Sequence, residues 1–263
     1  MRKCRLPSRE QCFEILRDCC VPEHIVRHCV TSAKLGVFIA ERLNEKGEKV
    51  NAELVERACL LHDVLRICEV HDFSRSLLRH SSNGCEGWIK WHASARLSSP
   101  KSDEHSSRRS AKPEPDKAKW QQLKARYKGL QHEDAACRLL EDEYPELAQV
   151  IRKHRYAGIL SGQDKPRTWE EKIVYYADKR VMHDKIVPLK ARLEEAHKRS
   201  SAQRYPTDQS ILDIKRIDTL IFELEREIFG RVGLEPDDLP AELIESSSDP
   251  PSREGRSRSG GVA

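Results

Sequence analysis

The sequence lacks a long hydrophobic run, and it has few aromatic residues. Of its 263 residues, 38% are hydrophobic and only 6% are aromatic. No run approaches the roughly 18 consecutive apolar residues that a membrane helix needs. The N-terminal residues are too charged to form the apolar core of a signal peptide. We therefore expect a cytoplasmic protein with no membrane partner.

The sequence also lacks a marked excess of charge of one sign and any C-x-x-C pair of cysteines. Its 47 Lys and Arg residues are nearly cancelled by 43 Asp and Glu residues, which leaves a net charge of +4. This small excess does not favour nucleic-acid binding, because the basic residues are mixed with acidic ones. The nine cysteines are an odd number without a C-x-x-C pair. We expect reduced core thiols rather than disulfides or a thiolate metal site.

What the sequence does contain is helical periodicity. Apolar residues recur at three- and four-residue steps over residues 21–43 and predict a helix that begins near Pro22. Asn51 is expected to cap a second helix that runs through Leu65. A capping box at residues 168–171 is expected to open a long helix that ends or kinks at Pro188. Further helices are predicted over residues 120–127, 132–141, 145–154 and 208–229. No segment alternates long enough to predict a strand, so the predicted fold class is all-α.

Two segments show no apolar period. Residues 81–118 are rich in Ser, Lys, Arg, Asp, Pro and Glu, and residues 246–263 form a Ser/Pro/Arg/Gly tail. Such compositions bury too little surface to offset the entropy of ordering, so we predict a disordered insertion and a disordered C-terminal tail. The remainder predicts one helical domain over residues 1–200, interrupted by the insertion. A C-terminal helical extension over residues 201–245 is expected to pack on it.

The predicted apolar helix faces carry ionisable residues. These are His28, the pair His62-Asp63, His154 and Asp178. Imidazoles and carboxylates that converge from separate helices are how helical bundles build metal sites. Nitrogen and oxygen ligands without thiolate suit divalent Mn, Fe, Co, Ni, Zn or Mg. Two alternatives stay open: a lone core histidine with satisfied hydrogen bonds, and an ion-paired structural Asp178. The remaining histidines have no comparable support: His24, His71, His80, His92, His105, His183 and His197.

The order of these residues resembles that of the HD-domain metal-dependent phosphohydrolases. The most specific pieces are ACLLHDVLR (58–66) and YYADKRVMHD (175–184), and the resemblance spans residues 22–193 apart from the insertion. It implies an HD-domain-like helical bundle in which His28, His62, Asp63 and Asp178 bind a first divalent ion. Members with two ions use two further histidines. His132 in QHEDAACRLL and His154 in VIRKHRYAG stand at matching positions.

The same resemblance implies an enzyme. Its expected activity is hydrolysis of a phosphomonoester or phosphodiester, of a nucleotide, by a metal-activated water. Asp63 and Arg66 are the candidate catalytic residues. Arg66 stands where many relatives have a lysine and is also a candidate substrate contact, because a guanidinium can bind phosphate through two parallel hydrogen bonds. Lys179 and Arg180, beside Asp178, are weaker candidates for substrate binding, and a solvated or ion-paired role stays open for either.

The sequence departs from the named subfamilies, so the substrate stays open. Hydrolases of the stringent-response alarmone resemble His-Asp-x-x-Glu-Asp, whereas Arg66-Ile67 occupy the last two places here. Deoxynucleoside monophosphatases expect a glutamate at position 66, and the Gly-Tyr-Pro signature of cyclic-di-GMP phosphodiesterases is missing. The alternative function is a non-catalytic HD-like module that binds a nucleotide or a protein and signals through its insertion or tail. The ion identity, the choice between one ion and two, and the oligomeric state also stay open.

Overall fold

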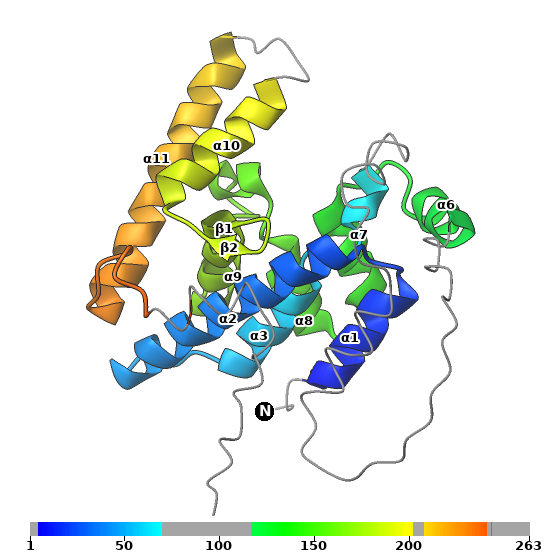
Figure 1. The fold of residues 1–263 in the computed structure, drawn as a ribbon, viewed down its shortest axis with the longest axis horizontal. Coiled ribbons are helices and arrows are strands. Elements are labelled where there is room, and N and C mark those ends of the chain that lie inside the picture. Colours follow the sequence, from blue (N-terminus) through cyan, green and yellow to red (C-terminus); the bar gives the residue numbers. More distant parts are fainter. Residues whose placement is uncertain (1–4, 70–116, 202–207, 241–242, 244–263) are drawn as a thin grey trace, which may run out of the picture.

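The computed structural model describes residues 5–69, 117–201, 208–240 and 243, and these residues are predominantly helical (Figure 1). The all-α prediction is therefore confirmed. The elements in chain order are α1 (Arg9–Asp18), α2 (Glu23–Glu45), α3 (Ala52–Leu61), the 3-10 helix η1 (Arg66–Glu69), α6 (Lys117–Arg126), α7 (His132–Leu140), α8 (Pro145–Arg152), the 3-10 helix η2 (Tyr156–Leu160), α9 (Trp169–Arg180), β1 (Val181–Met182), β2 (Lys185–Ile186), α10 (Leu189–Ser201) and α11 (Asp208–Val232).

Side-chain caps explain where several helices begin. Asn51 caps α3 by accepting a hydrogen bond from the Leu54 amide, as predicted. Thr168 and Glu171 form the predicted capping box of α9. A second capping box, which the sequence analysis missed, lies at Ser8 and opens α1. In both boxes side chains satisfy backbone amides that the first helical turn leaves without partners.

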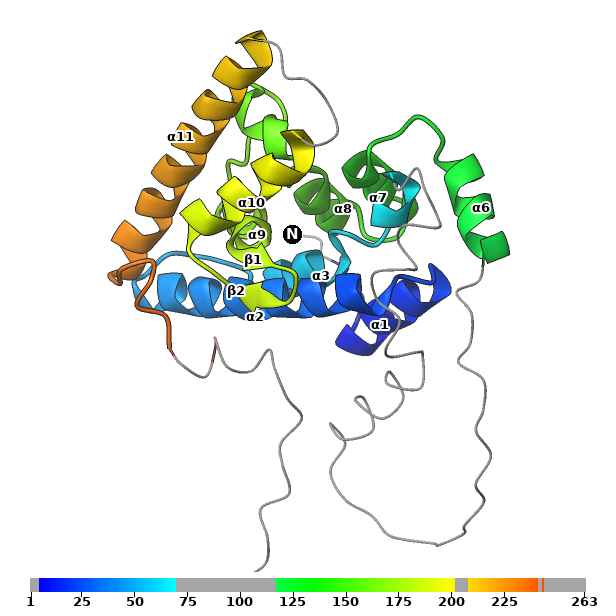
Figure 2. The same ribbon diagram turned by 45° about the horizontal axis from the view of Figure 1, so that its top comes forward.

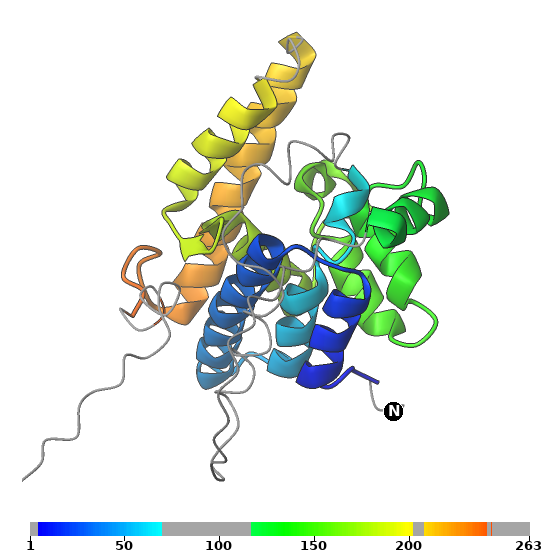
Figure 3. The ribbon, with the colours of Figure 1, turned by 45° about the vertical axis from the view of Figure 1, so that its right-hand side comes forward.

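Helix α2 is the main packing element of the core. It packs against α3 and α9, and it lies along one side of the fold with α3 beside it (Figure 2). Gly36 allows the close approach, because a Cβ atom there would lie 3.0 Å from both Cys59 Sγ and Val55 Cγ1. Helices α6 and α11 lie at opposite ends of the molecule (Figure 2 and Figure 3). Helix α3 also packs against α9, between these two ends.

Three predicted helix ends are wrong. The helix from residue 168 ends at Arg180 rather than Pro188, and a small antiparallel pair of strands follows, with Val181 opposite Ile186. His183 turns the chain with a left-handed φ of 59°. The pair contradicts the expectation of no strand, because two-residue strands are too short to leave an alternating pattern in the sequence. Helix α3 ends at Leu61 instead of Leu65, and α8 ends two residues before His154.

The predicted insertion and tail fall almost entirely outside the described residues. Of residues 81–118, only 117 and 118 are described, and they belong to α6, so the helix begins before the predicted boundary. Residues 246–263 lie outside as well.

The extension predicted at 201–245 contains α11, which packs against η2, α2 and α9. The division into a 1–200 domain and an extension stays a prediction.

The cysteines within the described part of the chain are free thiols, as expected: Cys12, Cys19, Cys20, Cys29, Cys59, Cys68 and Cys137. Burial raises the pKa of Cys59 to about 12, which favours the neutral thiol. Among the described helices, none combines the length and the apolar character that crossing a membrane requires.

Candidate metal centre

The His62-Asp63 pair lies in the turn that follows α3. His62 is the C-cap of the helix, and the chain then turns through residues 62–65 before η1. On a regular helix adjacent side chains project about 100° apart. The turn places both side chains at the end of the helix, where His62 faces Asp178 of α9 and Asp63 faces His132 and His154. His62 and Asp63 are both buried, at 1% and 9% exposure.

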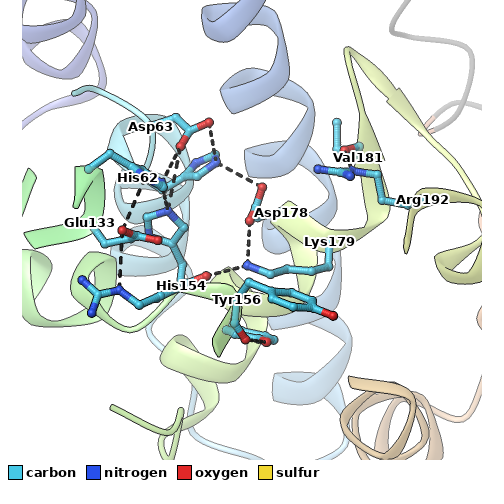
Figure 4. Close-up of polar contacts among 12 residues, drawn as sticks. His62, Asp63, Glu133, His154, Tyr156, Asp178, Lys179, Val181 and Arg192 are labelled. Atoms are coloured by element: carbon cyan, nitrogen blue, oxygen red, sulfur yellow. Dashed lines mark hydrogen bonds and ion pairs between the residues drawn. The ribbon is translucent and has the colours of Figure 1, made fainter. Parts of the chain in front are cut away.

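One group of possible ligands combines His28 of α2 with His62 and Asp63. One ligand atom from each lies within 4.8 Å of the others. Asp178 of α9 joins this group, because its Oδ1 atom lies 3.1 Å from His28 Nε2 and 3.6 Å from His62 Nε2. The side chains of His62, Asp63 and Asp178 point toward one another in the close-up (Figure 4). The structure therefore brings together all four residues predicted for a first ion.

A second group shares Asp63 with the first. It combines Asp63 with His132, at the start of α7, and His154, just beyond the end of α8. Asp63 Oδ1 lies 3.1 Å from His132 Nε2 and 3.9 Å from His154 Nε2, and the two Nε2 atoms are 3.1 Å apart. The two residues predicted for a second ion thus lie beside the first group, and Asp63 belongs to both.

Backbone carbonyl groups orient three of the four histidines. The Nδ1–H groups of His28, His62 and His154 donate to the carbonyl oxygens of His183, Cys59 and Ile151, respectively. A histidine that donates from Nδ1 carries its lone pair on Nε2, which is the arrangement that metal-binding histidines commonly show. His62 Nε2 is buried and has no hydrogen-bond partner among the described residues. In the neutral form of each ring the Nε2 lone pair would face the interior, where a cation could satisfy it.

The electrostatics of the two carboxylates also suit a cation. Burial acts to raise the pKa of Asp63, but Arg66 and His62 hold it well below its ordinary value. Burial likewise acts to raise the pKa of Asp178, and Lys179 together with the His28 hydrogen bond holds it well below the ordinary value. Both side chains are therefore anionic. Ionised carboxylates and neutral imidazoles form a donor set that fits Mn, Fe, Co, Ni, Zn or Mg.

The surroundings shift the pKa values of the two central histidines in opposite directions. Burial lowers the pKa of His154, which keeps this imidazole neutral and able to act as a ligand. Burial acts in the same direction on His62, but the neighbouring Cys29 thiol and the Asp63 carboxylate raise its pKa well above the ordinary value. A proton and a cation therefore compete for His62 Nε2, as they do at metal-binding histidines in general.

The basic residues near the centre have different surroundings. The Arg66 guanidinium lies at the rim, 3.8 Å from Asp63 Oδ1 and 2.9 Å from His132 Nε2, and about half of its side chain is exposed. The Lys179 ammonium is buried, lies 2.8 Å from Asp178 Oδ2 and donates to the carbonyl of His154. Arg180 points away from the centre and forms an ion pair with Glu225. These contacts fit the ion-paired alternative for Arg180 rather than a substrate contact.

The other described histidines lie outside both groups. His183 contributes its backbone carbonyl, and the side chain of His197 approaches Tyr156 and Asp218. His24 belongs to neither group, whereas His71, His80, His92 and His105 lie outside the described residues. The sequence analysis missed Glu133, a buried carboxylate next to His132. Its position in the first turn of a helix, where acidic residues are common, gives no signal of this burial.

Comparison with known proteins supports the resemblance seen in the sequence. Residues 25–96 match the model of the HD domain. This range includes His28, His62 and Asp63, whereas His132, His154 and Asp178 lie beyond it. No curated protein and no solved structure matches the chain. Residues 25–96 are thus similar to an HD domain, and the match leaves the subfamily open.

Proposed function

We propose that the protein is a metal-dependent phosphoric ester hydrolase that acts on a phosphomonoester or phosphodiester of a nucleotide. The observation that carries the proposal is the position of Asp63, which belongs at once to two groups of possible histidine and carboxylate ligands, all buried except the half-buried His28. A carboxylate shared in this way is suited to two neighbouring cations. Two-metal phosphatases and nucleases hold their ions about 3.5–4 Å apart. HD domains as a family are associated with metal-dependent hydrolysis of phosphoesters, and the match over residues 25–96 supports this activity.

In this proposal each side chain has a defined task. His28, His62 and Asp178 hold a first divalent cation with Asp63, and His132 and His154 hold a second one with the same carboxylate. A divalent ion bound there supplies Lewis acidity, which lowers the pKa of water and offsets charge on phosphoryl oxygens. Arg66, at the rim, binds the phosphate of the substrate. Lys179 donates to Asp178 and to the His154 carbonyl, so we assign it to the orientation of both ligands.

Metal binding and turnover test the proposal together. Purified protein freed of metal should bind two equivalents of Mn²⁺ by calorimetry. The loaded protein should release phosphate or a nucleoside from at least one member of a panel of nucleotide monoesters and diesters. Failure to bind Mn²⁺, Co²⁺ or Zn²⁺ would contradict the metal centre. Binding of ions and a nucleotide without turnover would instead favour the non-catalytic module.

Replacing Arg66 should weaken substrate binding without removing metal. A hydrogen bond to a charged group is worth about 1.5–3 kcal/mol, so Arg66→Ala should lower kcat/KM about 10- to 100-fold. Arg66→Lys should recover part of the loss, because it keeps the charge but not the two-pronged geometry. Arg138→Ala, which alters an exposed Arg138–Glu141 pair, is the matched control. Unchanged kcat/KM in Arg66→Ala would remove Arg66 from the substrate site.

A further inference from the structure

The Arg66 guanidinium contacts two of the three residues in the second ligand group. Its Nη1 atom lies 2.9 Å from His132 Nε2, 3.2 Å from His132 Nδ1 and 3.8 Å from Asp63 Oδ1. The Asp63 Oδ1 and His132 Nε2 atoms are themselves 3.1 Å apart. A positively charged side chain therefore stands beside atoms on which a second cation would also depend.

The contact between Arg66 and His132 opposes ion binding in either tautomer of the neutral ring. A guanidinium only donates hydrogen bonds, so it pairs with whichever ring nitrogen carries the lone pair. With the lone pair on Nε2, Arg66 uses the same lone pair that an ion requires. With the proton on Nε2, Arg66 pairs with Nδ1, and Nε2 cannot bind an ion. In both cases an ion on Nε2 must first break the hydrogen bond from Arg66.

Repulsion between like charges adds to this competition. Burial acts to raise the pKa of Asp63, and Arg66 is foremost among the neighbours that hold it low, so Arg66 already serves as a countercharge to the carboxylate. A divalent ion on the same carboxylate would lie close to the guanidinium, which stays protonated at all ordinary pH values. Water screens such repulsion poorly next to buried groups. The second ion is therefore disfavoured while Arg66 keeps this position.

Arg66 has the freedom to leave this position, unlike Lys179. The Arg66 side chain is 47% exposed, whereas that of Lys179 is 8% exposed and donates to the carbonyl of His154. The backbone amide of Arg66 donates to the carbonyl of Asp63, which fixes the main chain while the long side chain can turn. A phosphate group offers a guanidinium two parallel charge-assisted hydrogen bonds. An anionic phosphate at the rim therefore competes with His132 for Arg66.

We propose that Arg66 makes binding of the second ion conditional on phosphate. Without phosphate, Arg66 holds His132 and Asp63 against the ion, and a bound phosphate group draws the guanidinium away from both. The inference rests on the proposed function, because it assigns the coupling between the second ion and the phosphate of the substrate. By linkage, the ion and the phosphate then raise each other's affinity by the same factor.

Mn²⁺ titration of the metal-free protein by calorimetry tests the competition. Arg66→Ala should tighten the second site about 10- to 100-fold, because the ion no longer has to break a hydrogen bond to a charged group. Arg66→Lys keeps the charge and should stay closer to wild type. Arg152→Ala is the matched control, since its side chain is 45% exposed and pairs with Asp134, outside both ligand groups. A second site that is equally strong, or equally undetectable, in wild type and Arg66→Ala would overturn the inference, as would equal tightening in Arg152→Ala.

Inorganic phosphate tests the release of Arg66. At a concentration at which manganese phosphate stays dissolved, it should tighten the second Mn²⁺ site of wild type at least about tenfold. The same phosphate should tighten that of Arg66→Ala much less, because no guanidinium has to be removed. Equal tightening in the two proteins would show that phosphate acts on the ion directly, and it would reject the proposed coupling.

A measurement on metal-free protein distinguishes failure of this inference from failure of the proposed function. In ¹H–¹⁵N NMR spectra, inorganic phosphate should shift the ring resonances of His132 in wild type, because Arg66 leaves the ring, and should leave them unshifted in Arg66→Ala. His132→Gln assigns these resonances by their loss. Unshifted His132 resonances in wild type would overturn the inference even if two ions bind. A phosphate-dependent shift in a protein that binds no Mn²⁺ would support the role of Arg66 and count against the proposed function alone.

Discussion

Asp63→Asn should abolish both metal binding and turnover. The substitution keeps the size of the side chain but removes the negative charge that both ligand groups share. A bound metal ion contributes several kcal/mol to stabilisation of the transition state, and each 1.4 kcal/mol is a factor of ten in rate. We therefore expect kcat/KM to fall at least about 1000-fold. Removing a residue that belongs to one group, such as His28 or His154, should leave one ion bound.

A readout independent of activity separates this result from a folding defect. Saturating Mn²⁺ should raise the melting temperature of wild type, because an ion at 100 times its Kd stabilises the folded state by about 2.7 kcal/mol. Asp63→Asn should show no such rise, whereas its metal-free unfolding should remain cooperative. Asp142→Ala, which changes an exposed aspartate after α7, should behave as wild type. A full Mn²⁺-induced shift in Asp63→Asn would contradict the shared role of Asp63.

Glu225→Ala should cause the largest loss of stability. Glu225 Oε1 lies 2.9 Å from Arg180 Nη1 and accepts a hydrogen bond from Tyr176 at 2.6 Å. The Arg180 side chain is only 3% exposed. Removing one partner of a buried ion pair typically costs about 3–5 kcal/mol, and the remaining contact of Arg180 Nη2 with the exposed Asp237, at 3.3 Å, compensates only part of the charge. Because Arg180 ends α9 and Glu225 belongs to α11, the substitution should loosen the attachment of α11.

The measurement is the free energy of unfolding from urea titrations, with the slope checked for two-state behaviour. Glu227→Ala is the matched control on the same helix, because Glu227 pairs with Lys172 and about half of its side chain is exposed. An exposed pair of this kind contributes less than about 1 kcal/mol. The double variant Arg180→Met with Glu225→Leu should recover much of the loss, since neither charge remains buried. Equal losses in the free energy of unfolding for Glu225→Ala and Glu227→Ala would show that the buried pair contributes no more to stability than the exposed one.

Much of the helical architecture could be predicted because the helices have apolar faces and recognisable caps. The three- and four-residue periodicity predicts α2 and α11, and side chains at Asn51 and Thr168 mark two helix starts. The ends of helices were less predictable. Helix α9 ends at Arg180 because Val181 pairs with Ile186, a contact that forms only after the chain has turned. Helix α1 was missed because its charged sequence obscured the Ser8 capping box.

The candidate site was predictable to the extent that its residues form a linear pattern. His28, His62, Asp63 and Asp178 occur in a recognisable order, and the structure brings them together with His132 and His154. The surroundings of the charged residues were not predictable. Lys179 and Arg180 are neighbours in the sequence, yet one approaches Asp178 and the other Glu225. The direction of each side chain at the end of α9 depends on which elements pack on each side of the helix. The spacing of residues in the sequence does not carry this information.

The carbonyl acceptors of the three anchored histidines have a consequence for sequence divergence. His183 and Ile151 support His28 and His154 through backbone oxygen atoms, which every amino acid possesses. Selection for ligand orientation at these positions therefore acts on backbone path rather than on side-chain identity. At position 183 the left-handed φ should favour Asn or Gly among replacements and disfavour β-branched residues. Distant relatives can thus keep the carbonyl contacts of the candidate metal centre although the residues that provide them differ.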